Sequence, residues 1–145
     1  MPVKPIPDGY HSITPYLVVH GAAGIIEFAK QAFDAQEILR MPGPNGTVGH
    51  AEFRVGDSVV MIADAGSEHA QRPANLMLYV PDVDAVYERA LKAGGISERE
   101  PSNQFYGDRS AGVSDPAGNR WWIATHVEDV SAEEMQRRMA QTKPG

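Results

Sequence analysis

The segment DPAGNRWWIA, residues 115–124, decides the fold of this chain. Its Asp, Pro, Gly and Asn residues are strong turn formers, and the residues that follow are aromatic or β-branched, as strands prefer. The segment therefore predicts a turn that joins two strands, DRSAGVSD (108–115) and NRWWIAT (119–125). Together with ISERE (96–100) just upstream, it predicts three consecutive strands.

A strand and a helix come before these three strands. NLMLYV (75–80) is apolar and short enough for a buried strand. DVDAVYERALKAGG (82–95) predicts a helix that begins after an N-cap at Asp82 and stops at Gly94. The second half of the chain thus has the order β-α-β-β-β.

The first half of the chain repeats this order. AAGIIEFAKQAF (22–33) predicts an amphipathic helix, because its apolar residues recur at helical spacing. HAEFRVGDSVVMIAD (50–64) predicts a hairpin that turns at Gly56 and Asp57. The two remaining predicted strands are ITPYLVV (13–19) and QEILRM (36–41).

The repeat predicts the fold class and the domain organisation. Two βαβββ modules indicate an α+β protein with mixed sheets and outer helices. We expect one domain over residues 1–145, since this length supports a single hydrophobic core. Its parts are module one at about 13–64, module two at about 75–126 and a C-terminal helix at about 131–141. Ser131, followed three residues later by Glu134, forms the capping-box pattern that starts this helix.

Composition and charge exclude several classes of function. The net charge of −6 repels a polyanion, so we expect no nucleic-acid partner. The chain has no cysteine and therefore no disulfide or thiolate metal site, which suits a reducing compartment. Residues 1–12 contain three prolines and no apolar run, so they predict neither a signal peptide nor a membrane anchor. We expect a cytoplasmic protein that does not bind membranes.

The paired modules and the closing DPAGNRWWIA resemble the vicinal-oxygen-chelate superfamily, which includes glyoxalase I, bleomycin-resistance proteins and extradiol dioxygenases. The resemblance spans roughly residues 13–126. The phrases IEFAKQAF, GDSVVMIAD and FYGDRS look like an uncharacterised bacterial glyoxalase-like subgroup. The resemblance implies that the strands of each module curl into half of a cup, that the cup holds a small molecule, and that the protein is a homodimer. Whether the modules pair within one chain or swap between chains stays open.

The resemblance also implies where a metal would bind. Enzymes of this superfamily hold a divalent cation with His, Glu or Gln side chains on the first and last strands of each module. Counting from the motifs places these positions at Thr14, Met61, Asn75 and Trp122. An indole cannot coordinate a cation, and none of the four residues is an imidazole or carboxylate ligand. We therefore predict no metal and no cofactor, and expect the four side chains to meet at the bottom of one hollow.

Strand alternation sorts the other side chains by face. His50, Glu52 and Arg54 share one face of their strand, and across the hairpin turn Glu52 pairs with Met61, which puts these polar groups on the metal-site side. His50 is the natural acid or base, with Glu52 beside it. The structural alternatives are that His50 is a surface or hydrogen-bonded histidine and that Glu52 faces solvent or pairs with an arginine.

In module two, alternation places Asn75 and Met77 on the concave face. If DPAG makes a four-residue turn, Arg109 lies on the same side as Trp122, although an arginine here is more often a structural fork that bridges Asp108 or a loop carbonyl. Trp122 offers a flat ring on which a ligand can stack. Tyr16 and Tyr106 are candidates for the pocket rim or a dimer seam.

Three hypotheses follow. The first is a protein that binds a small planar or aromatic molecule in a metal-free pocket. The second is an enzyme, a lyase, isomerase or dioxygenase-like protein, that acts on a small oxygenated metabolite with His50 and Glu52 as acid–base groups. The third is a scaffold or regulatory dimer whose cup has no ligand.

Overall fold

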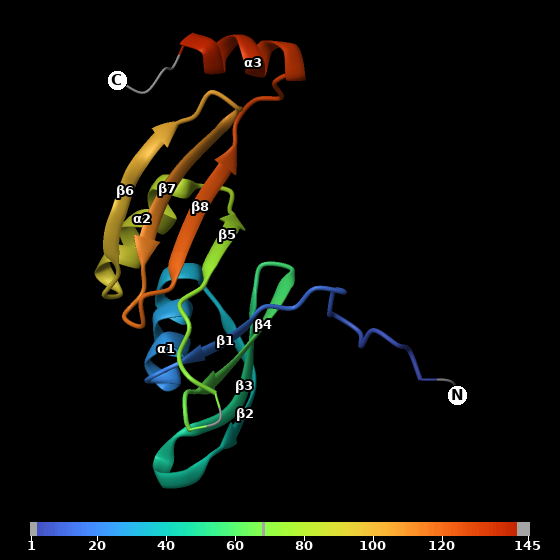
Figure 1. Cartoon of the computed structure of the whole chain (residues 1–145), viewed down its shortest axis with the longest axis vertical. Coiled ribbons are helices and arrows are strands. Elements are labelled where there is room, and N and C mark those ends of the chain that lie inside the picture. Colours follow the sequence, from blue (N-terminus) through green and yellow to red (C-terminus); the bar gives the residue numbers. More distant parts are fainter. Residues whose placement is uncertain (1–2, 68, 142–145) are drawn as a thin grey trace.

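The computed structural model describes residues 3–67 and 69–141, so parts of the predicted lead-in, linker and C-terminal end lie outside the described residues. It contains two four-stranded mixed sheets and three α-helices (Figure 1). The elements in chain order are β1 (Tyr16–Val19), α1 (Ala22–Phe33), β2 (Gln36–Pro42), the 3₁₀ turn η1 (Pro44–Gly46), β3 (Val48–Val55), β4 (Ser58–Asp64), β5 (Asn75–Tyr79), α2 (Val83–Lys92), β6 (Ile96–Asn103), β7 (Asp108–Ser114), β8 (Arg120–His126) and α3 (Ala132–Gln141).

The two sheets have the same topology. The first has the strand order β1-β4-β3-β2 and the second the order β5-β8-β7-β6. In each, the first strand of the module lies parallel to the last, and the other neighbours are antiparallel. The predicted α+β fold of two βαβββ modules is therefore confirmed in both element order and spatial order.

In each module, one side chain near the end of the last strand accepts hydrogen bonds from the start of the helix. Asp64, the last residue of β4, accepts hydrogen bonds from the backbone N–H groups of Gly21, Ala22 and Val48. Burial raises the pKa of Asp64, but these three hydrogen bonds outweigh burial and hold the pKa below its ordinary value. Thr125 is the corresponding residue of the second module, and its hydroxyl accepts from Val83 N–H at the start of α2.

Local turn chemistry follows the sequence closely. Gly56 adopts a φ of 58° in the two-residue turn between β3 and β4, as the hairpin prediction requires. The Asp82 side chain caps α2 by accepting from Ala85 N–H. Ser131 Oγ accepts from Glu134 N–H at the start of α3, which confirms the serine half of the predicted capping box, whereas the Glu134 carboxylate binds Arg137 and Arg138.

The turn between β7 and β8 is one residue longer than expected. Ser114 pairs with Arg120, so residues 115–119 form a five-residue loop and not a four-residue one. Asp115 organises this loop, because its buried carboxylate accepts from Asn119 and from the indole Nε1 of Trp121. The extra residue reverses the face that every β7 side chain presents, relative to the four-residue prediction.

The two modules share one hydrophobic core. The rings of Phe33 in α1 and Trp121 in β8 lie 4.8 Å apart, and Phe28 packs edge-on against Phe33. Gly95 allows the end of α2 to approach Phe28, since a Cβ at this position would lie 3.2 Å from the ring. The helix faces that the sequence predicts as apolar are therefore buried between the modules as well as on the sheets.

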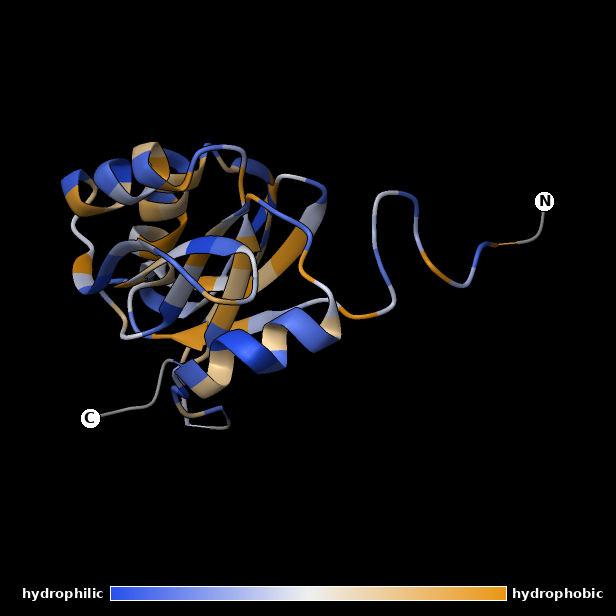
Figure 2. Ribbon diagram, turned by 90° about the horizontal axis from the view of Figure 1, so that it is seen from above, coloured by the Kyte–Doolittle hydropathy of each residue, from blue (hydrophilic) through white to orange (hydrophobic). Residues whose placement is uncertain are grey.

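The strand and helix bounds differ from the sequence-based ones at a few ends. β1 begins at Tyr16 and not at residue 13, because Pro15 has no N–H to contribute to a ladder. The first part of the lead-in extends away from the body of the molecule (Figure 2), whereas Tyr10 and His11 near its end contact the first sheet and its hairpin turn. α3 lies at the far end of the second module (Figure 1) and has no buried residue. Within the described residues, no helix is both long enough and apolar enough to cross a membrane.

Candidate functional site

We call the face of the first sheet that points away from α1 the first concave face. Cross-strand partners share a face, so the register puts Leu39 beside Glu52 and Met41 beside His50. Glu52 pairs on its other side with Met61, as expected, and Met61 pairs with Tyr16. The face is thus a polar pair, His50 and Glu52, with apolar side chains on both flanks.

Glu52 is the centre of a hydrogen-bond chain. The residue is 7% exposed, and its carboxylate accepts from the hydroxyl of Tyr10 and from Nε2 of His50 at 2.8 Å. A neutral imidazole that donates through Nε2 accepts through Nδ1, which lies 3.3 Å from the Tyr16 hydroxyl. Burial raises the pKa of Glu52, but the bonds from Tyr10 and His50 outweigh it and hold the pKa below its ordinary value.

The lead-in covers part of this face. It forms a hollow of about 370 Å³ together with the sheet, and Thr14, Glu52 and Met61 line it. The bond to Glu52 in turn raises the pKa of Tyr10, because the carboxylate favours the protonated phenol. The lining contributed by the lead-in is Pro5, Ile6, Pro7, Tyr10, His11 and Ser12.

The second concave face, on the side of the second sheet away from α2, is built around Trp122. The indole Nε1 donates to Oδ1 of Asn75 at 3.2 Å, which fixes the ring orientation. The ring lies against Gly112, where a Cβ would come within 2.4 Å of Cζ3 of the indole. A hollow of about 250 Å³ opens beside the ring, and its lining is Met77, Arg99, Tyr106, Ser110 and Trp122.

Arg109 does not lie on this face, so that expectation is wrong. Arg109 pairs with Thr125, and its guanidinium forms two hydrogen bonds, of 2.9 and 3.0 Å, with the carboxylate of Asp84 on α2. The five-residue loop at 115–119 is the reason, because it shifts the odd-numbered residues of β7 to the helix side. Arg109 is thus a structural fork, as the alternative had it, but its partner is Asp84 on α2 and not a loop.

A second chain of polar side chains crosses the far end of the second concave face. Asp108, 3% exposed, accepts from the Tyr79 hydroxyl at 2.7 Å and lies 2.8 Å from Nδ1 of His126. Nε2 of His126 lies 2.8 Å from Asp129. Contact with Asp108, and then with Asp129, raises the pKa of His126 because both nitrogens face carboxylates. Asp108 likewise raises the pKa of Tyr79.

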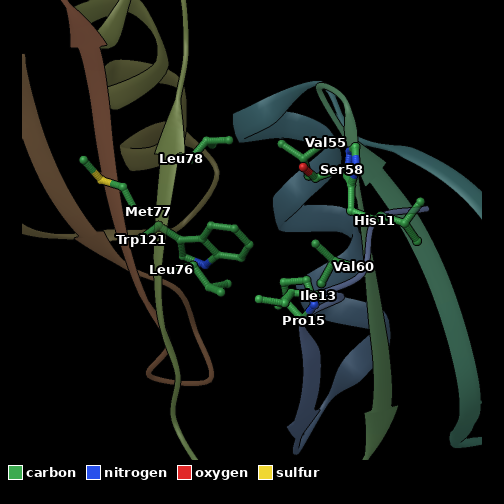
Figure 3. Close-up of a pocket in the computed structure, with 11 residues that line it drawn as sticks. His11, Ile13, Pro15, Val55, Ser58, Val60, Leu76, Met77, Leu78 and Trp121 are labelled. Carbon is green, nitrogen blue, oxygen red and sulfur yellow. The ribbon is translucent and has the colours of Figure 1, made fainter. Parts of the chain in front are cut away.

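A separate cavity of about 210 Å³ lies between the modules (Figure 3). Val60 of the first sheet and Leu76 and Trp121 of the second face one another across it. His11 and Ser58 are polar side chains in its lining, and most of the other lining residues are apolar. The convergent polar groups expected of a specific binding site lie on the two concave faces instead.

The sequence profile of the Glyoxalase/Bleomycin resistance protein/Dioxygenase superfamily matches residues 10–123. The chain belongs to this superfamily. It is also 35% identical over 145 residues to the uncharacterized protein Mb0911c of Mycobacterium bovis, a match that covers 92% of this chain and 95% of that protein. The uncharacterized protein Rv0887c of Mycobacterium tuberculosis is 35% identical, with 92% and 85% covered.

Solved structures share the superfamily fold at low identity. Protein PA1353 from Pseudomonas aeruginosa superposes with a TM-score of 0.66 at 19% identity, covering 81% of this chain and 99% of that one. TioX from Micromonospora sp. ML1 superposes with a TM-score of 0.64 at 20% identity, covering 80% and 100%. A superfamily enzyme from Burkholderia phytofirmans PsJN gives 0.65 at 20% identity, covering 82% and 98%. At these identities the likeness concerns the fold.

The four positions where the superfamily resemblance implies a metal are divided between the two concave faces. Thr14 and Met61 line the hollow under the lead-in, whereas Trp122 and its bonded partner Asn75 belong to the second concave face. The expectation that all four meet in one hollow is therefore not met within this single chain.

The donor set at these positions does not fit a divalent cation. The Thr14 hydroxyl donates to the carbonyl of His11, and the amide oxygen of Asn75 is taken by Trp122. Met61 offers a thioether, and the indole of Trp122 has no lone pair available for coordination, whereas the divalent cations that superfamily enzymes hold prefer carboxylate or imidazole ligands. Within residues 3–67 and 69–141, no cluster of three His, Cys, Asp or Glu side chains has the spacing of a metal site.

Sequence reasoning missed three members of the concave faces. Tyr10 lies in a proline-rich segment with no strand or helix period, so its contact with Glu52 leaves no local signal. Gly112 reads as an ordinary strand glycine, although a glycine inside a strand does indicate close approach of another group. The face on which Arg99 lies cannot be predicted from alternation, because a register shift in β6 determines it.

Proposed function

We propose that this protein binds a small planar or aromatic molecule on its concave faces, without a metal. The observation that carries the proposal is the indole of Trp122, fixed by Asn75 and seated on Gly112 beside the hollow. A held aromatic ring offers stacking area at little entropic cost. Met77 and Tyr106 supply the apolar wall around it.

We propose further that two copies form the complete site. Four large side chains on the concave faces are about half exposed or more in the described part of the single chain: Tyr16 at 51%, Met41 at 58%, Met77 at 49% and Tyr79 at 59%. Exposed apolar groups that gather on one face favour an interface or a ligand. The first concave face of one copy, set against the second concave face of the other, would cover these side chains and enclose a larger cavity.

The binding proposal is tested with a library of planar metabolites and antibiotics, by thermal shift with and without divalent cations. We expect ligands that raise Tm without added metal and that quench Trp122 fluorescence. Trp122→Ala should abolish the quenching, whereas Trp121→Phe, in the core, should keep it. If no planar compound shifts Tm, or if a shift requires a metal, the proposal fails.

A second candidate function is favoured by the Tyr10–Glu52–His50–Tyr16 chain. A half-buried imidazole hydrogen-bonded to a buried carboxylate is an arrangement that can move a proton to or from a bound substrate. In this second proposal the protein is a lyase, isomerase or dioxygenase-like enzyme that acts on a small oxygenated metabolite. His50 is the acid or base, and Glu52 is its partner. No turnover is needed for the first proposal, so the two are separable.

Kinetics distinguish the two candidates. Suppose that the protein turns over a compound identified by binding. Loss of this turnover in His50→Ala and in Glu52→Gln, together with a raised KM in Trp122→Ala, would establish the enzyme. Binding that survives both variants, with no product formed, would leave the binding protein. We propose a cytoplasmic location for either one, supported by the absence of cysteine from the sequence.

A further inference from the structure

The hollow beside Trp122 contains one positively charged side chain, Arg99, from β6. Its guanidinium carbon lies 5.4 Å from the centre of the Trp122 ring, and its Nη2 donates to the hydroxyl of Ser110. We infer that the planar ligand carries a carboxylate or a similar anionic group and that Arg99 is its receptor. This inference rests on the proposed binding function and names the ligand class.

A register shift in β6 is what brings Arg99 to this position. Ser97 pairs with Val113, but the next pair is Arg99 with Gly112, so one residue is inserted between them. Without the insertion, Glu98 would pair with Gly112, directly beside the indole. The shift therefore places a cation next to the Trp122 ring, where regular alternation would place an anion.

The displaced Glu98 does not neutralise Arg99. Its carboxylate accepts from the Ser114 hydroxyl at 2.8 Å and lies 3.6 Å from Nε of Arg120. The other acid on this face, Asp108, is bonded to Tyr79 and His126. Among the described residues Arg99 has no carboxylate within ion-pair distance, in a protein whose net charge is −6.

The guanidinium has capacity for an anion. Of its five N–H donors, one is given to Ser110, and the others have no partner among residues 3–67 and 69–141. A guanidinium presents a planar fork that matches a carboxylate, and the neighbouring indole presents a planar face. A flat molecule with an acidic substituent satisfies both groups at once, whereas a neutral flat molecule satisfies only the indole.

Matched pairs of probes that differ only in charge test the inference. The pairs are benzoate with benzamide, cinnamate with cinnamamide, and naphthoate with naphthamide. Binding is measured by calorimetry to the whole protein and to Arg99→Met and Arg99→Lys. Arg89→Met, which removes an exposed cation on α2, is the matched control. Circular dichroism and Tm verify that each variant is folded.

We expect the carboxylate of at least one pair to bind wild-type protein about tenfold more tightly than its amide, as a charge-assisted hydrogen bond provides. Arg99→Met should remove the difference and leave amide binding unchanged, Arg99→Lys should keep part of it, and Arg89→Met should keep all of it. Equal binding of acid and amide, or a preference that survives Arg99→Met, would overturn the inference but leave the proposed function standing. If neither member of any pair binds, while neutral planar compounds from the library do, the inference fails; if nothing planar binds, both fail.

Discussion

The Nε2 atom of His50 lies 2.8 Å from Oε2 of Glu52, two residues further along the same strand. Residues i and i+2 of a strand share a face, so this pair is a direct product of alternation. The other oxygen of Glu52 is bonded to Tyr10, which comes from the proline-rich lead-in. This hydrogen bond joins the lead-in to the first concave face, and a second contact, between Nε2 of His11 and the carbonyl oxygen of Asp57, joins it to the turn between β3 and β4.

Replacing Tyr10 with Phe should raise the pKa of Glu52, because burial then acts against one hydrogen bond fewer. We expect a loss of about 1 kcal/mol in the free energy of unfolding at neutral pH. A carboxylate whose pKa is lowered by folding stabilises the protein above its ordinary value of 4.5, and this contribution is lost as the pH falls through the folded pKa. The difference between wild-type and variant should therefore shrink in acid, as measured by urea unfolding and carboxyl NMR titration.

The matched control for this change is Tyr106→Phe. Its hydroxyl makes no hydrogen bond within the described part of the chain, so the stability should be unchanged at every pH. A Glu52 pKa that does not change after Tyr10→Phe would show that the Tyr10 hydroxyl does not bond to Glu52 in solution.

Replacing Gly112 with Ala should displace the Trp122 ring, since the new methyl group would lie 2.4 Å from Cζ3 of the indole. Overpacking of this kind costs about 1–3 kcal/mol of stability. We expect a changed near-ultraviolet circular dichroism spectrum and loss of planar-ligand binding in a protein that remains folded. Gly24→Ala on α1 has open space around it and should instead be neutral or stabilising. An unchanged Trp122 signal in Gly112→Ala would contradict the described ring position.

His126 should titrate above its ordinary value of 6.5, because Asp108 and Asp129 both favour the imidazolium. The pH dependence of stability that His126 contributes is therefore opposite in sign to the one that Glu52 contributes. A raised histidine pKa stabilises the folded protein fully below 6.5, and the contribution is lost as the pH rises through the folded pKa. His126→Gln should therefore destabilise the protein more in mild acid than in base. Asp129→Asn should lower the His126 pKa only in part, since Asp108 remains; an NMR titration at or below 6.5 in wild-type protein would refute the geometry.

Mixing two defective variants should show whether the cup is shared between copies. Met61→Lys damages the first concave face and Trp122→Ala the second, so neither homodimer should bind the planar probe that wild-type protein binds most tightly. If the modules swap, a mixed dimer has one cup with both defects and one with none, and an equal mixture recovers about a quarter of the wild-type sites. If each chain forms its own cup, every site carries one defect and no binding returns after subunit exchange. Sedimentation of the wild-type protein should give a dimer, and a monomer would remove the shared cup.

Most of the fold could be predicted because local signals agree with one another. The apolar spacing of α1, the Asp82 cap of α2 and the glycine turn at Gly56 each have a short-range physical cause, and each is present in the structure. The register of the β3–β4 hairpin followed from its two-residue turn, so the pairing of Glu52 with Met61 was also predictable.

The candidate site was less predictable because it depends on insertions of single residues. One extra residue in the loop at 115–119 moves Arg109 to the helix side, and one in β6 moves Arg99 beside Trp122. A strand has a period of two, so each insertion reverses the face of every residue beyond it. The contact between Tyr10 and Glu52 spans 42 residues and has no periodic signal at all.

The contact of Phe33 with Trp121 makes the duplicated halves dependent on each other. If the chain were cleaved between β4 and β5, the two halves would stay together under native conditions, because the apolar surface around Phe33 and Trp121 is buried only between the modules. Either half produced by itself would expose that surface to water and aggregate. The repeat is thus one of architecture, and neither copy is a portable unit that could be transplanted into another protein.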